Sequence, residues 1–86
     1  MIKTVNIAYY EKKDWNYFLS IIEDKESMHD SWDDWHKAYL KTKTQLISEG
    51  FFVKVVSINI IELIDYCLDR KIKNDGKARS QFVMTK

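Results

Sequence analysis

The 86-residue sequence contains no proline, only two glycines and a single cysteine. One cysteine, Cys67, cannot form an intramolecular disulfide, and its position in an apolar helical pattern predicts a small buried side chain. Two isolated glycines, Gly50 and Gly76, cannot build a glycine-rich phosphate loop. The scarcity of glycine and proline also argues against a flexible linker or a disordered segment. We therefore expect a single folded domain over residues 1–86.

Long hydrophobic runs are also missing. No stretch approaches the roughly 18–20 apolar residues that a membrane span requires. Residues 1–10 lack the apolar core and the cleavage site of a signal peptide. These features predict a cytoplasmic protein that does not contact a membrane. The formal net charge of +1 provides no overall attraction to nucleic acid or anionic lipid.

The strongest local pattern is an amphipathic helix over residues 31–50. Ser31 is placed as its N-cap, with Asp34 three residues further on, and Gly50 is the expected residue just beyond its C-terminus. At about 100° per residue, the bulky side chains share one arc of the helix. These side chains are Trp32, Trp35, Tyr39, Leu40, Leu46 and Ile47.

Two segments have the character of β-strands. Residues 3–10 alternate between two faces and are rich in β-branched and aromatic side chains, which predicts a half-buried strand. Residues 51–58 are largely apolar on both faces, which predicts a strand that is more deeply enclosed than the first.

Three further helices are expected. Asp14 is placed to cap a helix over residues 14–24, after which comes a polar loop. Asn59, with Glu62 three residues later, predicts the start of a helix that continues to residue 72. Asp75 is placed to cap a short last helix over residues 77–83.

The resulting order is β-α-α-β-α-α, an α+β fold in which a two-stranded sheet packs against the helices. An isolated pair of strands is marginally stable, so a second copy that extends the sheet to four strands would stabilise it. The sequence therefore predicts a homodimer.

Charge is unevenly distributed along the chain. Residues 23–34 hold six acidic side chains against one lysine, and residues 70–86 hold six basic side chains against one aspartate. The two regions are expected to lie near each other, within or between subunits. We predict that the basic segment and its apolar end bind a protein partner. The candidate contact residues are Arg70, Lys71, Lys73, Lys77, Arg79 and Phe82. An alternative is that the cations bind nucleic acid phosphates.

Polar groups near the start of the long helix suggest a third possibility, a metal site or small enzyme centred on His29, Asp33 and His36. A helical metal site of the carboxylate type needs further glutamates and a second acid–histidine motif, which the chain lacks. His36 and Lys43 lie within the apolar stripe of the same helix. Either they are accommodated at the edge of the core, or they face an interface or cleft where His36 responds to pH.

Four aromatic residues, Trp15, Trp32, Trp35 and Tyr39, raise the question of an aromatic box for a base or a cation, although aromatics at helical spacing usually form a core. No Ser/His/Asp or Cys/His nucleophile arrangement can be read from the chain. We therefore expect no cofactor, and a non-catalytic protein-interaction or regulatory domain.

Overall fold

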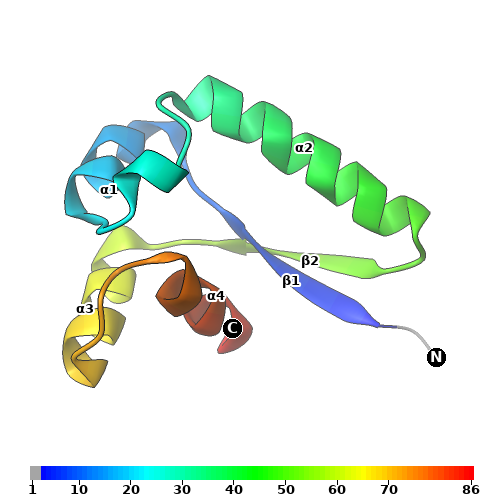
Figure 1. Ribbon diagram of the computed structural model, residues 1–86. Helices are drawn as coiled ribbons and strands as arrows, with labels where there is room; N and C mark the ends of the chain where they lie inside the picture. The colour runs from blue at the N-terminus through cyan, green and yellow to red at the C-terminus, as the bar shows by residue number, and fades with distance from the viewer. Residues whose placement is uncertain (1–2) are drawn as a thin grey trace.

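The computed structural model describes residues 3–86 of the chain. Its elements are β1 (Thr4–Tyr9), α1 (Trp15–Ile21), α2 (Trp32–Ser48), β2 (Phe52–Ser57), α3 (Ile60–Arg70) and α4 (Gly76–Met84). Two 3-10 turns, η1 (Lys12–Asp14) and η2 (Lys25–Ser27), lie before and after α1. The predicted α+β class, with helices packed around a two-stranded sheet, is confirmed (Figure 1).

The two strands are parallel, with Thr4 opposite Phe52 and Tyr9 opposite Ser57. Parallel strands cannot be joined by a tight turn, so the chain must cross from the end of one strand to the start of the other. Helices α1 and α2 make this crossover. Figure 1 shows α2 along one side of the sheet, with α3 and α4 on the other.

Contacts of β1 show which helix covers each face. The Tyr9 ring packs against Trp35 and Tyr39 of α2, with centroid distances of 5.8 and 5.3 Å. On the opposite face, Asn6 Nδ2 donates a hydrogen bond of 3.2 Å to the Val83 carbonyl of α4. Side chains alternate along a strand. The α2 face therefore holds Val5, Ile7 and Tyr9, and the α4 face holds Thr4, Asn6 and Ala8.

A cluster of buried aromatic side chains lies at the carboxyl ends of the strands. There Tyr10, Trp15, Phe18 and Trp35 form a contiguous aromatic cluster with centroid distances from 4.4 to 6.1 Å. Phe18 is fully buried, as is Leu63 of α3. Large aromatic side chains bury about 150–250 Å² each, which helps so short a chain to form a core.

The predicted helix ends are largely confirmed. Ser31, Asn59 and Asp75 each accept, through a side-chain oxygen, a backbone N–H three residues further on, at 3.0–3.2 Å. Gly50 lies just after α2 with φ of +91°, a conformation that an L side chain rarely adopts. These local signals therefore set the starts of three helices and the end of the longest.

The predicted start of the first helix is wrong. Asp14 makes no side-chain capping bond, because its backbone is already helical (φ −96°, ψ −6°) at the end of η1. The helix is also shorter than predicted and ends at Ile21.

The prediction that the second strand is the more enclosed is also wrong. Phe52 is 59% exposed and Val55 is 39% exposed, and Val56 is the strand's one buried residue. Its apolar sequence matched a central strand, but in a two-stranded sheet both strands are edges. Within residues 3–86 no further strand pairs with β2.

Neither α2 nor any shorter helix among the described residues combines the length and the apolar character needed to cross a membrane.

We expect Leu63→Ala to lower the free energy of unfolding by about 2–5 kcal/mol, because truncation of a fully buried leucine leaves a cavity. Leu68→Ala is the matched control on the same helix. Leu68 is 70% exposed, so its truncation should change the free energy by no more than about 0.5 kcal/mol. Urea unfolding of the two variants measures both values, and equal losses would contradict this packing of α3.

Candidate functional site

The outer edge of β1 presents backbone groups that no other strand within residues 3–86 satisfies. The Lys3 and Tyr9 carbonyls accept hydrogen bonds from the backbone N–H groups of Phe52 and Ile58, so odd-numbered residues of β1 turn their backbone groups toward β2. The intervening residues, Thr4, Asn6 and Ala8, turn theirs away. In the described part of the chain, these three residues have no backbone–backbone hydrogen bond on that outer side.

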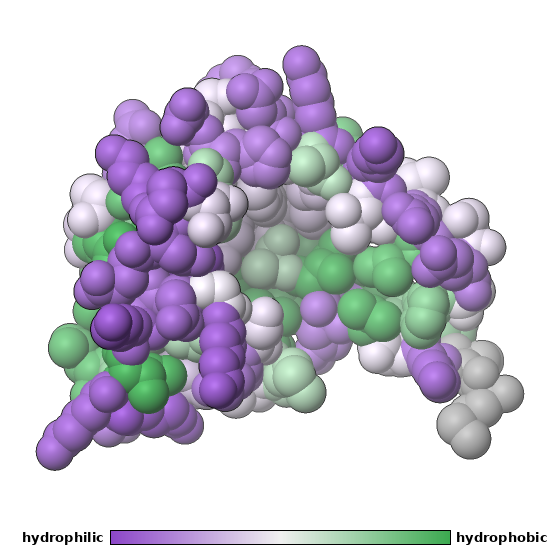
Figure 2. Space-filling view, viewed as in Figure 1, coloured by the Kyte–Doolittle hydropathy of each residue, from purple (hydrophilic) through white to green (hydrophobic). Residues whose placement is uncertain are grey.

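Two hollows flank this edge and share Ala8 and Met28. The hollow on the α2 side, of about 320 Å³, is lined largely by apolar and aromatic groups that include Ile7, Trp35 and Tyr39. We call the edge and its two hollows the β1 groove. Figure 2 shows hydrophobic surface gathered in a recess over the strands, with more polar surface around it.

The hollow on the α4 side is larger, about 540 Å³. It runs beside Thr4, Asn6 and Ala8, and its other wall includes Val83 and Met84 of α4. Of these two, Val83 is buried, whereas Met84 is 78% exposed.

One end of the groove is closed. The Tyr10 carbonyl, the next outward-facing group, accepts a 2.7 Å hydrogen bond from Trp32 Nε1 at the start of α2. An extended chain bound along the edge would therefore pair with residues 4–8 and stop at Tyr10.

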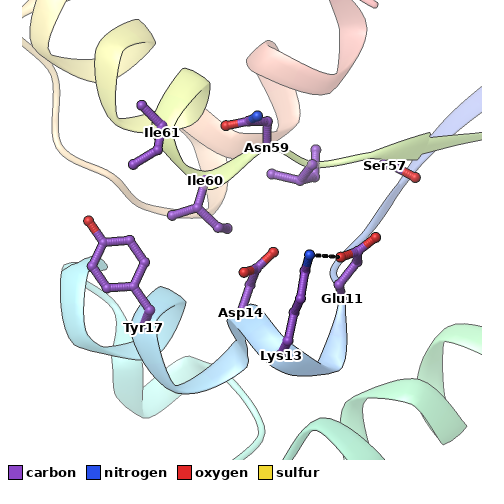
Figure 3. A pocket seen from close by; sticks show the side chains of 9 residues that line it. Glu11, Lys13, Asp14, Tyr17, Ser57, Asn59, Ile60 and Ile61 are labelled. Carbon is purple, nitrogen blue, oxygen red and sulfur yellow. Dashed lines mark ion pairs between the residues drawn. The ribbon is translucent and has the colours of Figure 1, made fainter.

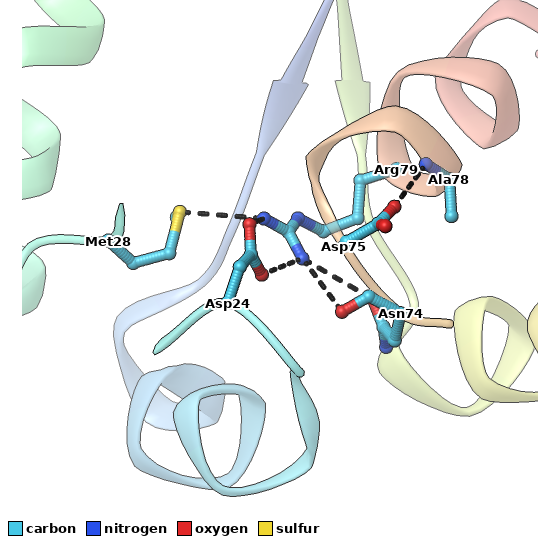
Figure 4. Close-up of polar contacts among 6 residues, drawn as sticks. All are labelled: Asp24, Met28, Asn74, Asp75, Ala78 and Arg79. Atoms are coloured by element: carbon cyan, nitrogen blue, oxygen red, sulfur yellow. Dashed lines mark hydrogen bonds and ion pairs between the residues drawn. The ribbon is translucent and has the colours of Figure 1, made fainter. Parts of the chain in front are cut away.

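A buried ion pair fixes the α4 wall of the groove (Figure 4). Arg79 is 7% exposed, and its guanidinium forms two hydrogen bonds with the Asp24 carboxylate, at 2.7 and 2.8 Å. It also donates to the Asn74 carbonyl at 3.2 Å, and that carbonyl accepts a second bond from the Glu23 backbone N–H. This paired geometry ties the start of α4 to the segment between α1 and α2.

The same ion pair shifts pKa values around it. Hydrogen bonding from Arg79 lowers the pKa of Asp24, because it stabilises the carboxylate. Burial raises the pKa of Tyr10, at the closed end of the groove, to about 12. Both groups therefore keep a fixed protonation state near neutral pH, which suits a structural role better than proton transfer.

The predicted contact between the acidic and basic regions is realised in this ion pair, and it removes two residues from the predicted partner surface. Arg79 is committed to Asp24, and Phe82 is buried at 4% exposure. Neither side chain is therefore available on the surface to a partner. The four remaining cations, Arg70, Lys71, Lys73 and Lys77, are exposed at the end of α3 and the start of α4.

The candidate metal ligands are not assembled into a site. Asp33 instead lies 3.7 Å from Lys12 in an exposed ion pair, and the His36 ring is stacked on Trp32 with a centroid distance of 4.4 Å. Over the described residues, no group of three or more His, Cys, Asp or Glu side chains is arranged to hold a metal ion.

The aromatic residues proposed as a box form core instead. Trp15 and Trp35 are buried against each other, with a centroid distance of 5.5 Å, which leaves no space between them for a ligand. His36 is half-buried and stacked between Trp32 and Tyr39, whereas Lys43 is half-buried further along the same helix. Cys67 is buried, as predicted, and burial raises the pKa of its thiol.

A further hollow of about 480 Å³ lies between η1, α1 and the start of α3 (Figure 3). Its polar groups include Glu11 and Lys13, which form an exposed ion pair at 3.4 Å. Charges that remain in water at such a distance interact weakly and are not activated for catalysis. This hollow is therefore a weaker candidate for a functional site than the β1 groove.

No protein-family model, curated protein or solved structure matches this chain. The candidate site is consequently defined by its own geometry. Sequence reasoning did not identify it, although one signal was available: residues 4–10 contain no charged side chain in a chain that is 31% charged.

We expect Asp24→Asn to lower the free energy of unfolding at pH 7 by about 3 kcal/mol, because it leaves the buried Arg79 charge without its counterion. The folded-state pKa of Asp24 lies below its unfolded value, so the ion pair's contribution is present above about pH 4 and is lost as the pH falls through the folded-state pKa. The difference between wild type and variant should therefore shrink in acid.

Urea unfolding at stepped pH values from neutral to acid measures this difference. Asp33→Asn is the control, since Asp33 is exposed in its ion pair with Lys12 and its loss should change the free energy by no more than about 0.5 kcal/mol. A difference between wild type and Asp24→Asn that is independent of pH would contradict the assigned role of the ion pair.

Proposed function

We propose that this chain is a non-catalytic protein-interaction module that binds an extended peptide segment along the free edge of β1. The observation that carries the proposal is the edge itself: unpaired at Thr4, Asn6 and Ala8, uncharged, and flanked by a hollow on each side. In such binding, backbone hydrogen bonds supply affinity, and pockets for alternate side chains supply specificity.

The lack of edge protection supports this assignment. Exposed edges attract other strands, and proteins usually block them with charged side chains, proline, bulges or a covering segment. Residues 4–9 contain no charge and no proline, whereas β2 carries Lys54 in the middle of its length. The β1 edge is therefore the better strand acceptor of the two.

The two hollows suggest what the bound segment is like. Side chains of an added strand alternate between the faces of the sheet. Those on one face would meet Ile7, Trp35 and Tyr39, and those on the other would meet Val83 and Met84. We therefore expect a segment without proline that places apolar residues at alternate positions toward the α2 side.

The homodimer expected from the sequence fits the same proposal, because a second copy also carries an extended strand. The four exposed cations, Arg70, Lys71, Lys73 and Lys77, would serve as an accessory surface for an acidic stretch of a partner. With Arg79 paired to Asp24, the nucleic-acid alternative is left with only these cations near the predicted surface. We propose that the module acts in the cytoplasm, as the sequence predicts.

We expect Ala8→Pro to abolish peptide binding, because proline removes an outward N–H of β1 without touching the bonds to β2. Val55→Pro is the matched control, since the N–H of Val55 points away from β1 at the opposite edge. The measurement is selection from a displayed library of random short peptides by protein immobilised at low density, so that copies do not meet. Binding of the selected peptides to each variant is then compared.

Selected peptides should lack proline and alternate in hydrophobicity, and Val55→Pro should retain them. Thermal unfolding of both variants establishes that each is folded. Absence of any selected peptide, or binding that survives Ala8→Pro but is lost in Val55→Pro, would overturn the assignment of the β1 edge.

A further inference from the structure

We infer that the segment bound in the β1 groove is the β1 strand of a second copy of this chain, which joins two sheets into one of four strands ordered β2-β1-β1-β2. This inference rests on the proposed function and specifies the partner. Four strands are within the common size of a sheet, whereas two are marginal.

The charge distribution of the groove is compatible with a second copy as the occupant. Across a two-fold axis each charged group near the axis meets its own copy, so a charged surface repels itself. Among the described residues that line the two hollows, Arg79 is the one permanently charged, and it is neutralised by Asp24. His29 also lines the α2-side hollow, where it lies exposed.

The backbone geometry fixes the pairing. A two-fold axis perpendicular to the sheet makes the two β1 strands antiparallel, with Asn6 opposite the second copy's Asn6 and Thr4 opposite its Ala8. These are the residues whose backbone groups face outward, so each opposed pair can exchange both hydrogen bonds. This register uses all of the open edge and stops before Tyr10, whose carbonyl is already bonded to Trp32.

Because this axis is perpendicular to the sheet, the α2 faces of both copies would lie on one side of the four-stranded sheet and their α4 faces on the other. The second copy's Val5 and Ile7 would therefore lie on the α2 side, beside the apolar lining of that hollow. Its Thr4, Asn6 and Ala8 would lie on the α4 side. The apolar side chains of β1 would thus meet the apolar hollow of the other copy, and the small and polar side chains would lie on the α4 side.

Met84 provides an independent reason for the same axis. It is the most exposed of the large hydrophobic side chains in the described residues, at 78%, and it lines the α4-side hollow. Its neighbour Val83 is hydrogen-bonded to Asn6, the residue on the axis, so Met84 lies close to the axis as well. Pairing of the strands would bring the two Met84 side chains together and cover both.

The experiment is sedimentation equilibrium of the full chain over a wide range of concentrations. Wild type should approach twice the chain mass of 10.3 kDa. Met84→Lys and Met84→Glu should each raise the dimer dissociation constant by about tenfold or more, because like charges then meet across the axis without partners. An equimolar mixture of the two variants should regain the dimer as a mixed species.

Leu68→Lys is the matched control. Leu68 is 70% exposed on α3, away from the groove, and should retain the wild-type dissociation constant. As a second readout, amide exchange at Asn6 and Ala8 should slow as the protein concentration rises, because these N–H groups become hydrogen-bonded in the dimer.

A wild type that stays monomeric overturns the inference, as does dissociation by Leu68→Lys in place of the Met84 variants. A dimer whose Asn6 and Ala8 amides stay unprotected overturns it too. If the protein is monomeric yet binds library peptides in a manner that Ala8→Pro abolishes, the second copy is excluded and the proposed function stands. If the protein is monomeric and binds no peptide, both this inference and the proposed function are overturned.

Discussion

The parallel pairing of β1 with β2 is the constraint on which the rest of this structure depends. Parallel strands require a long crossover, and here α1 and α2 provide it, with α2 packed along one face. The opposite face must then be covered by the part of the chain beyond β2, and α3 and α4 have this role. Because residues 3–86 form a sheet of two strands, each strand has an unpaired edge, and the arrangement of the helices decides how accessible each edge is.

The walls of the β1 groove are held by two different kinds of interaction. On the α2 side, Trp35 anchors the helix by packing against Tyr10 and Trp15. On the α4 side, the bidentate Arg79–Asp24 pair joins segments that are 55 residues apart in the sequence. Dispersion forces have no directional requirement, but a buried charge must meet its partner with defined geometry, so the ion pair fixes the position of α4 more narrowly. A rigid wall also lowers the entropy lost when a segment binds.

Pairing with an extended backbone explains why the β1 groove carries so little charge. The chain is rich in charged residues, yet residues 4–9 of β1 carry none, and the Arg79 cation in the α4 wall is neutralised by Asp24. A surface used for pairing with extended backbone benefits from such neutrality, since each charge buried there would have to be desolvated. Polar groups are instead concentrated on the outer faces of the helices, where water solvates them.

The sequence by itself determined the local structure. Ser31, Asn59, Asp75 and Gly50 set helix ends through bonds or dihedral angles that involve near neighbours, so their effects can be predicted without knowledge of the fold. The predicted Asp14 cap failed because the adjacent 3-10 turn already makes its backbone helical, whereas the enclosure of β2 depends on what lies across space.

Only the tertiary structure decided that Arg79 and Phe82 are buried, that Trp35 belongs to a core rather than a ligand box, and that the edge of β1 is unpaired between two hollows. The physical reason is that burial and strand pairing are set by contacts between segments distant in the chain. Hydrophobic periodicity shows which side of an element is apolar, but not which neighbour, if any, will cover it.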